Sequence, residues 1–200
     1  MEDLNNKYIG TLNNKLNKSS LIVSAICNEI NNNQDIKRLL FYSSLNPLSP
    51  VGKYYDNSKK KQPDINFTLL GETEKSKQLI FDEAFNPSMI IEQNSCIYVS
   101  DVWGILDDTI GEIGFEINIV VPYVYNKLMN LGEKRTHLIA GRIADFLDMI
   151  TIDKNRFFKY SPYLGNIQFI LTDYNYGRVA KNNDMLCFNM QFVVKKATLR

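Results

Sequence analysis

The residues that could do chemistry in this chain are few, and they are widely separated. His137 is the only histidine, and it lies near the start of the segment EKRTHLIAGRIADFLDMI, residues 133–150. A histidine that acts as a general base needs a partner to orient it and a substrate proton within reach. The sequence contains neither a GxSxG nucleophile elbow nor a cysteine–histidine signature. We therefore expect a structural helix here, and we predict no catalytic residue and no enzymatic activity.

Metal and cofactor sites are not indicated by the sequence either. The three cysteines, Cys27, Cys96 and Cys187, form no CxxC pair, and one histidine cannot complete a zinc set with them. We expect them to be reduced and buried. The carboxylates between positions 101 and 116 form no compact metal motif, and no glycine-rich phosphate-binding loop occurs. We predict that the protein holds no metal and no cofactor.

The charge balance argues against a general binder of nucleic acid or membranes. The 200 residues carry 23 Lys and Arg against 22 Asp and Glu, so the formal net charge is +1. Such binders usually show a basic excess. One basic run, Lys59, Lys60 and Lys61, lies beside Tyr54 and Tyr55. The run is typical of a solvated loop tip, and contact with nucleic acid or another polyanionic partner is the alternative.

The chain length and composition favour one domain with an extension. The hydrophobic share of 44% is sufficient for a core. We predict a flexible arm over residues 1–18, one domain over 19–200, and an exposed loop at about 51–66. The N-terminal segment lacks the apolar stretch of a secretory signal, and no apolar run reaches the length of a membrane span. We expect assembly in the cytoplasm and no membrane partner.

Helical spacing of apolar residues predicts three helices and leaves a fourth segment ambiguous. Residues 21–30 and 34–43 form the first two, separated by the asparagines at 31–33. Residues 72–85 are compatible with a short helix. In the third helix, at 135–150, Ala140, Ile143 and Leu147 share one face. We expect Arg135 and Arg142 to lie off this face, with Arg142 able to pair with Asp145 on the surface.

Alternation with a period of two predicts four strands. The clearest runs from 113 to 125 in EIGFEINIVVPYVYN, where every odd position is apolar or aromatic. Together with the segment around 97–103 it forms a hairpin, and Pro122 suggests an edge strand or an emerging loop. Residues 166–174 and 185–196 form a second hairpin. The predicted fold is α+β, with an antiparallel sheet of two hairpins packed on a central helix and with N-terminal helices.

The order of these segments resembles the neck and tail-completion proteins of tailed bacteriophages, in particular the tail terminator type. The resemblance is carried by IKRLLFY, SCIYVSDVW followed by GEIGFEINIVVPY, KRTHLIAGRIADFLDMI and NNDMLCFNMQFVV, and it covers roughly residues 20 to 197. It implies a virion structural protein that forms a homo-oligomeric ring, expected to be hexameric, at the head-proximal end of the tail. The implied partners are the tail tube protein and the head–tail connector or portal-associated proteins, with DNA passing through the lumen.

Aromatic residues near strand ends suit an interface in such a ring, although they could equally cap the strands. The candidate interface residues are Tyr123, Tyr125, Arg135, Arg142, Tyr174 and Tyr176. Two rival functions stay open at this point. One is another phage assembly protein, for head completion or the baseplate, and the other is an enzyme or a nucleic-acid-binding domain.

Overall fold

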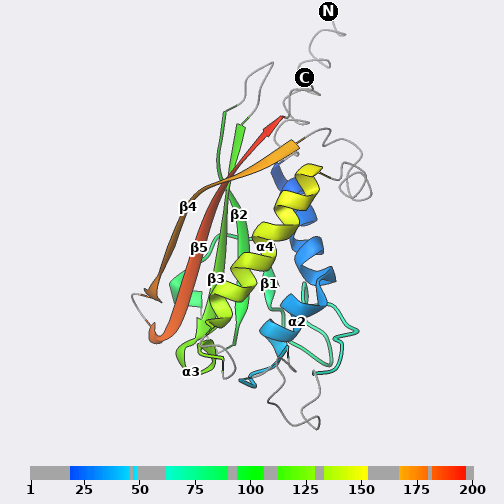
Figure 1. The fold of residues 1–200 in the computed structure, drawn as a ribbon, viewed down its shortest axis with the longest axis vertical. Helices are drawn as coiled ribbons and strands as arrows, with labels where there is room; N and C mark the ends of the chain where they lie inside the picture. The colour runs from blue at the N-terminus through cyan, green and yellow to red at the C-terminus, as the bar shows by residue number, and fades with distance from the viewer. Residues whose placement is uncertain are drawn as a thin grey trace, which may run out of the picture.

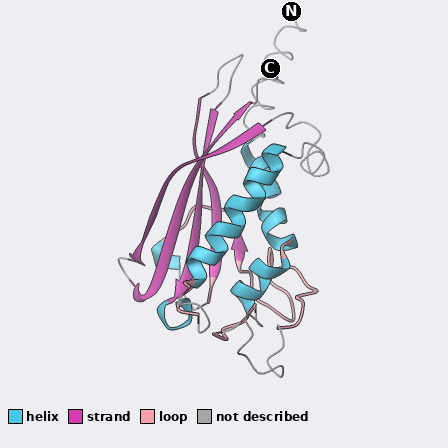
Figure 2. Cartoon of the chain, viewed as in Figure 1, coloured by secondary structure: helices cyan, strands magenta, loops and turns pink. Residues whose placement is uncertain are grey.

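The chain folds as an α+β domain in which the long helices cover one face of a five-stranded sheet (Figures 1 and 2). The computed structural model describes residues 19–45, 47–48, 62–89, 94–105, 112–128, 133–152, 167–179 and 182–196. A helix over 19–32 is followed by α2 (Gln34–Phe41), β1 (Ile80–Phe81), η1 (Pro87–Met89), β2 (Cys96–Ile105), β3 (Glu112–Pro122), α3 (Tyr123–Asn126), α4 (Arg135–Ile152), β4 (Ile167–Val179) and β5 (Asn182–Lys196). The predicted arm at 1–18 lies outside the described residues.

The sheet has the order β1-β2-β3-β5-β4. Both predicted hairpins are present, because β2 pairs antiparallel with β3 and β4 pairs antiparallel with β5. The expectation of a purely antiparallel sheet is wrong, since β1 pairs with β2 in parallel, with Ile80 opposite Ile97. No tight hairpin joins β1 to β2. Backbone hydrogen bonds to an earlier segment hold β1 in place instead. Leu79 N and Ile80 N both donate to Leu69 O at 2.9 and 3.0 Å.

The position of β3 rules out the edge strand that Pro122 suggested. β3 is the central strand: β5 pairs with it from Glu112 to Pro122, and β2 pairs with it from Glu112 to Val120. Pro122 ends it and precedes the single turn of α3, so the strand stops before Tyr123 and Tyr125. A proline at the end of a central strand is tolerated because the chain leaves the sheet there. In the second hairpin the strands are longer than predicted, and they extend into the segment GRVAKNND, residues 177–184, which the sequence favoured as a turn.

The main core lies between the sheet and the helices. The predicted apolar face of α4 is confirmed: Ile139, Ala140, Ile143 and Leu147 are all buried. They pack with the helix-facing side chains of the sheet, which belong to the same cluster: Ile97, Val99, Phe115, Ile117, Ile119, Val121, Phe169, Phe188, Met190, Phe192 and Val194. No described helix is both long and apolar enough to cross a membrane.

Residues 62–69 form a strap that is tied to α2. Gln34 exchanges two hydrogen bonds with the backbone of Ile65, at 3.0 and 3.2 Å, and the ammonium of Lys37 donates to Phe67 O at 2.5 Å. Arg38 donates to Gln62 O at 2.9 Å and forms an ion pair with Asp64. The C-terminal end of the predicted exposed loop is therefore anchored, because polar side chains of α2 satisfy its backbone groups. Residues 51–61 lie outside the described part of the chain.

The ambiguous segment 72–85 is not a helix. Thr73 N donates to Ser76 O at 2.8 Å, and the hydroxyl of Thr73 accepts from the backbone N–H of Ser76 at 3.0 Å, which closes a tight turn. Serine and threonine side chains compete for backbone groups in this way and so disfavour helix interiors. The following residues then join the sheet as β1.

Arg135 fastens the start of α4 to the end of α2. Its guanidinium is 0% exposed and donates to four backbone carbonyl oxygens. These are Leu39 O at 2.6 Å, Tyr42 O at 2.6 Å, Ser44 O at 2.5 Å and Tyr125 O at 3.0 Å. Leu39 and Tyr42 are at the C-terminal end of α2, where unpaired carbonyls carry the negative end of the helix dipole. Burial lowers the pKa of Arg135 to about 10, which leaves it charged at neutral pH.

The guanidinium geometry predicts a large effect of even a conservative change at this position. In Arg135→Lys a single ammonium replaces a planar group that reaches four carbonyls in different directions. We expect Arg135→Lys to lose about 2–3 kcal/mol of unfolding free energy, because buried carbonyls are left unpaired. Urea denaturation followed by circular dichroism measures the loss.

The matched control for that measurement is Arg142→Lys on the same helix. Arg142 is partly exposed and makes an ion pair with Asp35, so the control should cost less than about 1 kcal/mol. Equal losses for the two variants would contradict the role assigned to Arg135.

Candidate assembly surfaces

The two arginines predicted at an interface are both engaged within the protomer. Arg135 was expected to face outward, but it is fully buried by its bonds to carbonyls of α2 and α3. Arg142 does lie partly exposed, yet its ion-pair partner is Asp35 of α2 at 3.1 Å rather than the Asp145 suggested by helical spacing. The tertiary approach of α2 to α4 supplies that carboxylate. Arg135 is therefore unavailable to a neighbouring subunit.

The predicted tyrosines of β4 gather with the histidine at the N-terminal end of α4. The His137 ring packs edge-on against Tyr176 and Phe188, with ring centroids 4.9 Å apart in both cases. The Lys134 ammonium lies 4.4 Å from the Tyr176 centroid, and Tyr174 stacks parallel to Phe188 at 5.7 Å. This group mixes aromatic rings with cations on the helix-facing side of β4.

Asn126 joins this aromatic group to the helix start. Its amide oxygen accepts from Thr136 N at 3.0 Å and so caps α4, while its amide nitrogen donates to the Tyr176 hydroxyl at 3.1 Å. Tyr176 therefore has a role inside the protomer and is half-buried. Tyr174 is the tyrosine of this strand that is open to solvent.

Tyr123 and Tyr125 separate on the short helix α3. Tyr123 is exposed, and the Arg178 guanidinium lies 5.3 Å from its ring centroid. Tyr125 is half-buried, and its carbonyl belongs to the Arg135 network. The structure thus brings Tyr174 and Tyr176 together, places Tyr123 against Arg178 near the end of the same strand, and uses the Tyr125 carbonyl to hold the fold.

His137 shows no arrangement suited to acid–base chemistry among the described residues. Its Nδ1 lies 3.1 Å from the Thr136 hydroxyl, and its ring is occupied by the two aromatic contacts. Partial burial, and then the positive charge of Lys134, lower the pKa of His137. The ring is therefore neutral at physiological pH and contributes packing.

The face of the sheet that turns away from the helices carries a band of polar side chains. Two adjacent rows cross the strands β2, β3, β5 and β4. The rows are Ser100, Glu116, Gln191 and Asp173, and then Tyr98, Asn118, Asn189 and Asn175. We call these eight residues the polar band. It contains two carboxylates and several amides, and neither row contains a lysine or arginine.

Asn118 organises the centre of the polar band. Its amide oxygen accepts from Asn189 at 2.9 Å and from the Cys187 thiol at 3.5 Å, and its amide nitrogen donates to Glu116 at 2.5 Å. Asn118 itself is buried by these neighbours. Three other members of the band are exposed, namely Gln191 of β5 and Asp173 and Asn175 of β4. The network fixes the amides in place, so this face presents an ordered, hydrophilic surface.

Apolar residues cover this face at both ends of the polar band. At one end Phe81 stacks on Tyr98 with ring centroids 4.6 Å apart, and Phe85 adds a second contact at 5.1 Å. These rings cover a small second core that includes Cys96, Val120 and Met185. At the other end the indole of Trp103 lies over Gly114, its partner in the β2–β3 register.

The cysteines are free, as the sequence suggested. Cys27 and Cys96 are buried and Cys187 is half-buried. Burial is the main cause that raises the pKa of each thiol to about 12. Thiolate is the reactive form, so the raised pKa values disfavour reaction of these thiols near neutral pH. Within the described ranges, no three or more His, Cys, Asp or Glu side chains are grouped to hold a metal ion.

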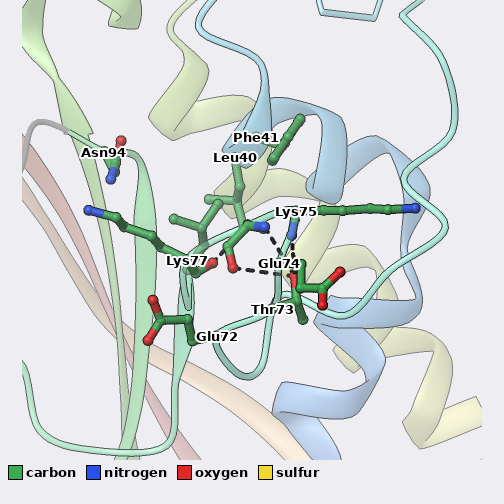
Figure 3. A pocket seen from close by; sticks show the side chains of 10 residues that line it. Leu40, Phe41, Glu72, Thr73, Glu74, Lys75, Lys77 and Asn94 are labelled. Atoms are coloured by element: carbon green, nitrogen blue, oxygen red, sulfur yellow. Dashed lines mark hydrogen bonds between the residues drawn. The ribbon is translucent and has the colours of Figure 1, made fainter.

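An open hollow of about 480 Å³ lies beside α2, around the turn at 73–76 (Figure 3). Its lining residues are Leu40, Phe41, Glu72, Thr73, Glu74, Lys75, Ser76, Lys77, Leu79 and Asn94. The polar groups of Thr73 and Ser76 are used within the turn, and the charged side chains are of both signs. The hollow offers no convergent set of groups for a ligand.

Comparison with protein-family models and with curated proteins finds no match for this chain. The candidate residues Lys59, Lys60 and Lys61 lie outside the described residues.

Sequence reasoning missed the polar band, although its signal is present in the sequence. Within the alternating strand β3, the even positions 116 and 118 are polar while the odd positions are apolar. Residues 189 and 191 repeat this pattern in β5. The sequence does not reveal the strand register, which places residues 116 and 118 of β3 beside residues 191 and 189 of β5.

The contact between Trp103 and Gly114 predicts a spectroscopic change on adding one methyl group. A Cβ at position 114 would lie 2.3 Å from the indole nitrogen, so the ring must move. Trp103 is the only tryptophan. We expect Gly114→Ala to shift its fluorescence emission to the red and to increase acrylamide quenching. Gly104→Ala is the control, because its nearest neighbour would be at an ordinary 3.8 Å, and equal spectra for the two variants would refute the contact.

Proposed function

We propose that this protein is a structural subunit of the tailed-phage neck, of the tail terminator type. Copies of the chain form a ring at the head-proximal end of the tail. The ring ends growth of the tail tube and presents a surface to the head connector, and the assembled virion is its location. The partners are other copies of the chain, the tail tube protein and connector or portal-associated proteins.

The polar band is the observation that carries this proposal. A sheet with helices packed on one face and ordered amides and carboxylates on the other suits the wall of a channel. DNA passing through a channel must not adhere to it, and cations are what neutralise DNA phosphates. The two central rows of the face carry Glu116 and Asp173 without a lysine or arginine, so they favour passage over binding.

The surroundings of His137 favour a structural role over an enzymatic one. The imidazole packs edge-on against Tyr176 and Phe188, and the buried Arg135, two residues before it in the sequence, donates to backbone carbonyls. These contacts stabilise the junction of α2, α4 and β4. The proposed function therefore requires neither cofactor nor metal.

Oligomeric state tests the proposal directly. We expect closed rings of several subunits when the purified protein is viewed by negative-stain microscopy at high concentration, with a matching mass from light scattering. A protein that stays monomeric at the highest concentration it tolerates would contradict the ring.

DNA binding supplies the second measurement. We expect weak retention of duplex DNA at physiological salt, and little difference between the wild type and a variant with Lys59→Glu, Lys60→Glu and Lys61→Glu. Tight, salt-sensitive binding that this triple variant loses would instead support the nucleic-acid-binding alternative.

A further inference from the structure

Strands β2 and β4 each have a side without a neighbouring strand among the described residues. β1 pairs only with Ile97 and Tyr98, so the rest of β2, residues 99–105, has no partner strand on its outer side among the described residues. β4 is the last strand at the opposite end of the sheet. Neither 99–105 (VSDVWGI) nor 168–174 (QFILTDY) contains the lysine or proline with which natural edge strands commonly prevent further pairing.

The exposed apolar side chains of the strands are concentrated on these two edges. Val102 is 57% and Trp103 45% exposed on β2, and Leu171 is 45% and Tyr174 64% exposed on β4. Within the described strands, these four are the large hydrophobic residues that are exposed to solvent. Each segment carries one register shift, between Asp101 and Trp103 in β2 and between Leu171 and Asp173 in β4, and the Tyr174 N–H donates to the Asp173 carboxylate at 2.7 Å. Irregularities of this kind limit pairing locally, so regular pairing is expected on either side of them.

The register places the two edges at the same height in the sheet. Val99, through β3 and β5, lies in the row of Tyr174, and Ile105 lies in the row of Gln168. Three antiparallel pairings separate β2 from β4, so the two strands run in opposite directions. A second copy placed head to tail, by rotation about an axis roughly along the strands, therefore presents its β2 antiparallel to β4 of the first.

We propose that copies of this chain join by pairing residues 99–105 of one subunit with residues 168–174 of the next, which continues the sheet across the subunit boundary. This inference rests on the proposed ring and specifies its interface. The contact is heterologous, with different surfaces on the two sides, and such contacts close into rings when the rotation is suitable. Because one rotation relates all subunits, the same face of every sheet points to the axis, and the proposed function requires that this face is the polar band.

Pairing through two engineered cysteines tests the contact. The variants are Val102→Cys and Leu171→Cys, treated with a short bis-maleimide; the poorly reactive native thiols keep the background low. Neither single variant should cross-link above the wild-type level. An equimolar mixture should give about tenfold more dimer than either alone, because pairing raises the effective concentration of the two thiols, and the double variant should give a ladder of multimers.

The matched control replaces Leu171→Cys with Val124→Cys. Val124 is also exposed, but it lies on α3, outside both of the segments proposed to pair. A mixture of Val102→Cys and Leu171→Cys that gives no more dimer than the mixture with Val124→Cys would overturn the proposed pairing.

Charge introduced on the edge provides an independent measurement. We expect Tyr174→Lys to raise the protein concentration needed for half-maximal assembly by about tenfold or more, since a lysine on an edge strand opposes pairing. Val124→Lys, a change at an equally exposed position on α3, should assemble as the wild type does. Thermal unfolding of both variants checks that they are folded, and equal assembly of the two would overturn the proposal.

The outcomes separate this inference from the proposed function. Rings that form in the wild type and persist in Tyr174→Lys without edge cross-links would mean that the ring is joined through another surface, which overturns the pairing alone. Edge cross-links in open filaments would support the pairing and contradict the terminator ring. Absence of both cross-links and multimers would overturn both.

Discussion

The buried guanidinium of Arg135 is the interaction on which the arrangement of helices and sheet depends. It draws together the carbonyl end of α2, the turn of α3 after the central strand, and the first residue of α4. A charge without an anionic partner is tolerated there because four carbonyl dipoles, two of them at the negative end of a helix, replace its water. Removing those acceptors would leave a desolvated cation, so the four bonds fix the relative positions of all three elements.

The second constraint is that the sheet has two chemically different faces. Odd residues of β3, such as Ile117 and Ile119, complete the helix-facing core, while Glu116 and Asn118 build the polar band on the reverse. The band stays ordered because its amides bond to one another across the strands. The helices cover the larger apolar face, and Phe81 and Phe85 cover the small second core on the reverse, so the middle of the reverse face stays polar.

Much of the fold is readable from local patterns. The period of two over 113–121 and the helical stripe that includes Ile143 both predict the observed burial, because each follows from backbone geometry alone. Expectations failed where they depended on which segments of the chain are neighbours in space. β1 pairs in parallel with β2 and is held there by hydrogen bonds to the strap at 62–69. Arg142 pairs with Asp35 because α2 lies close to α4. The candidate tyrosines were identified by type, but only Tyr123 and Tyr174 are exposed.

The sequence by itself determined the α+β class, the main helices, the four long strands with their helix-facing residues, and the absence of a CxxC pair among the cysteines. It did not predict β1 or the short helix α3. Only the tertiary structure decided that β3 is central, that Arg135 is inside, and that the open segments of β2 and β4 lie in the same rows. The physical reason is the range of the interactions. Periodicity and capping act over a few residues, whereas strand order, register and the partners of a buried charge join residues 69 to 107 positions apart.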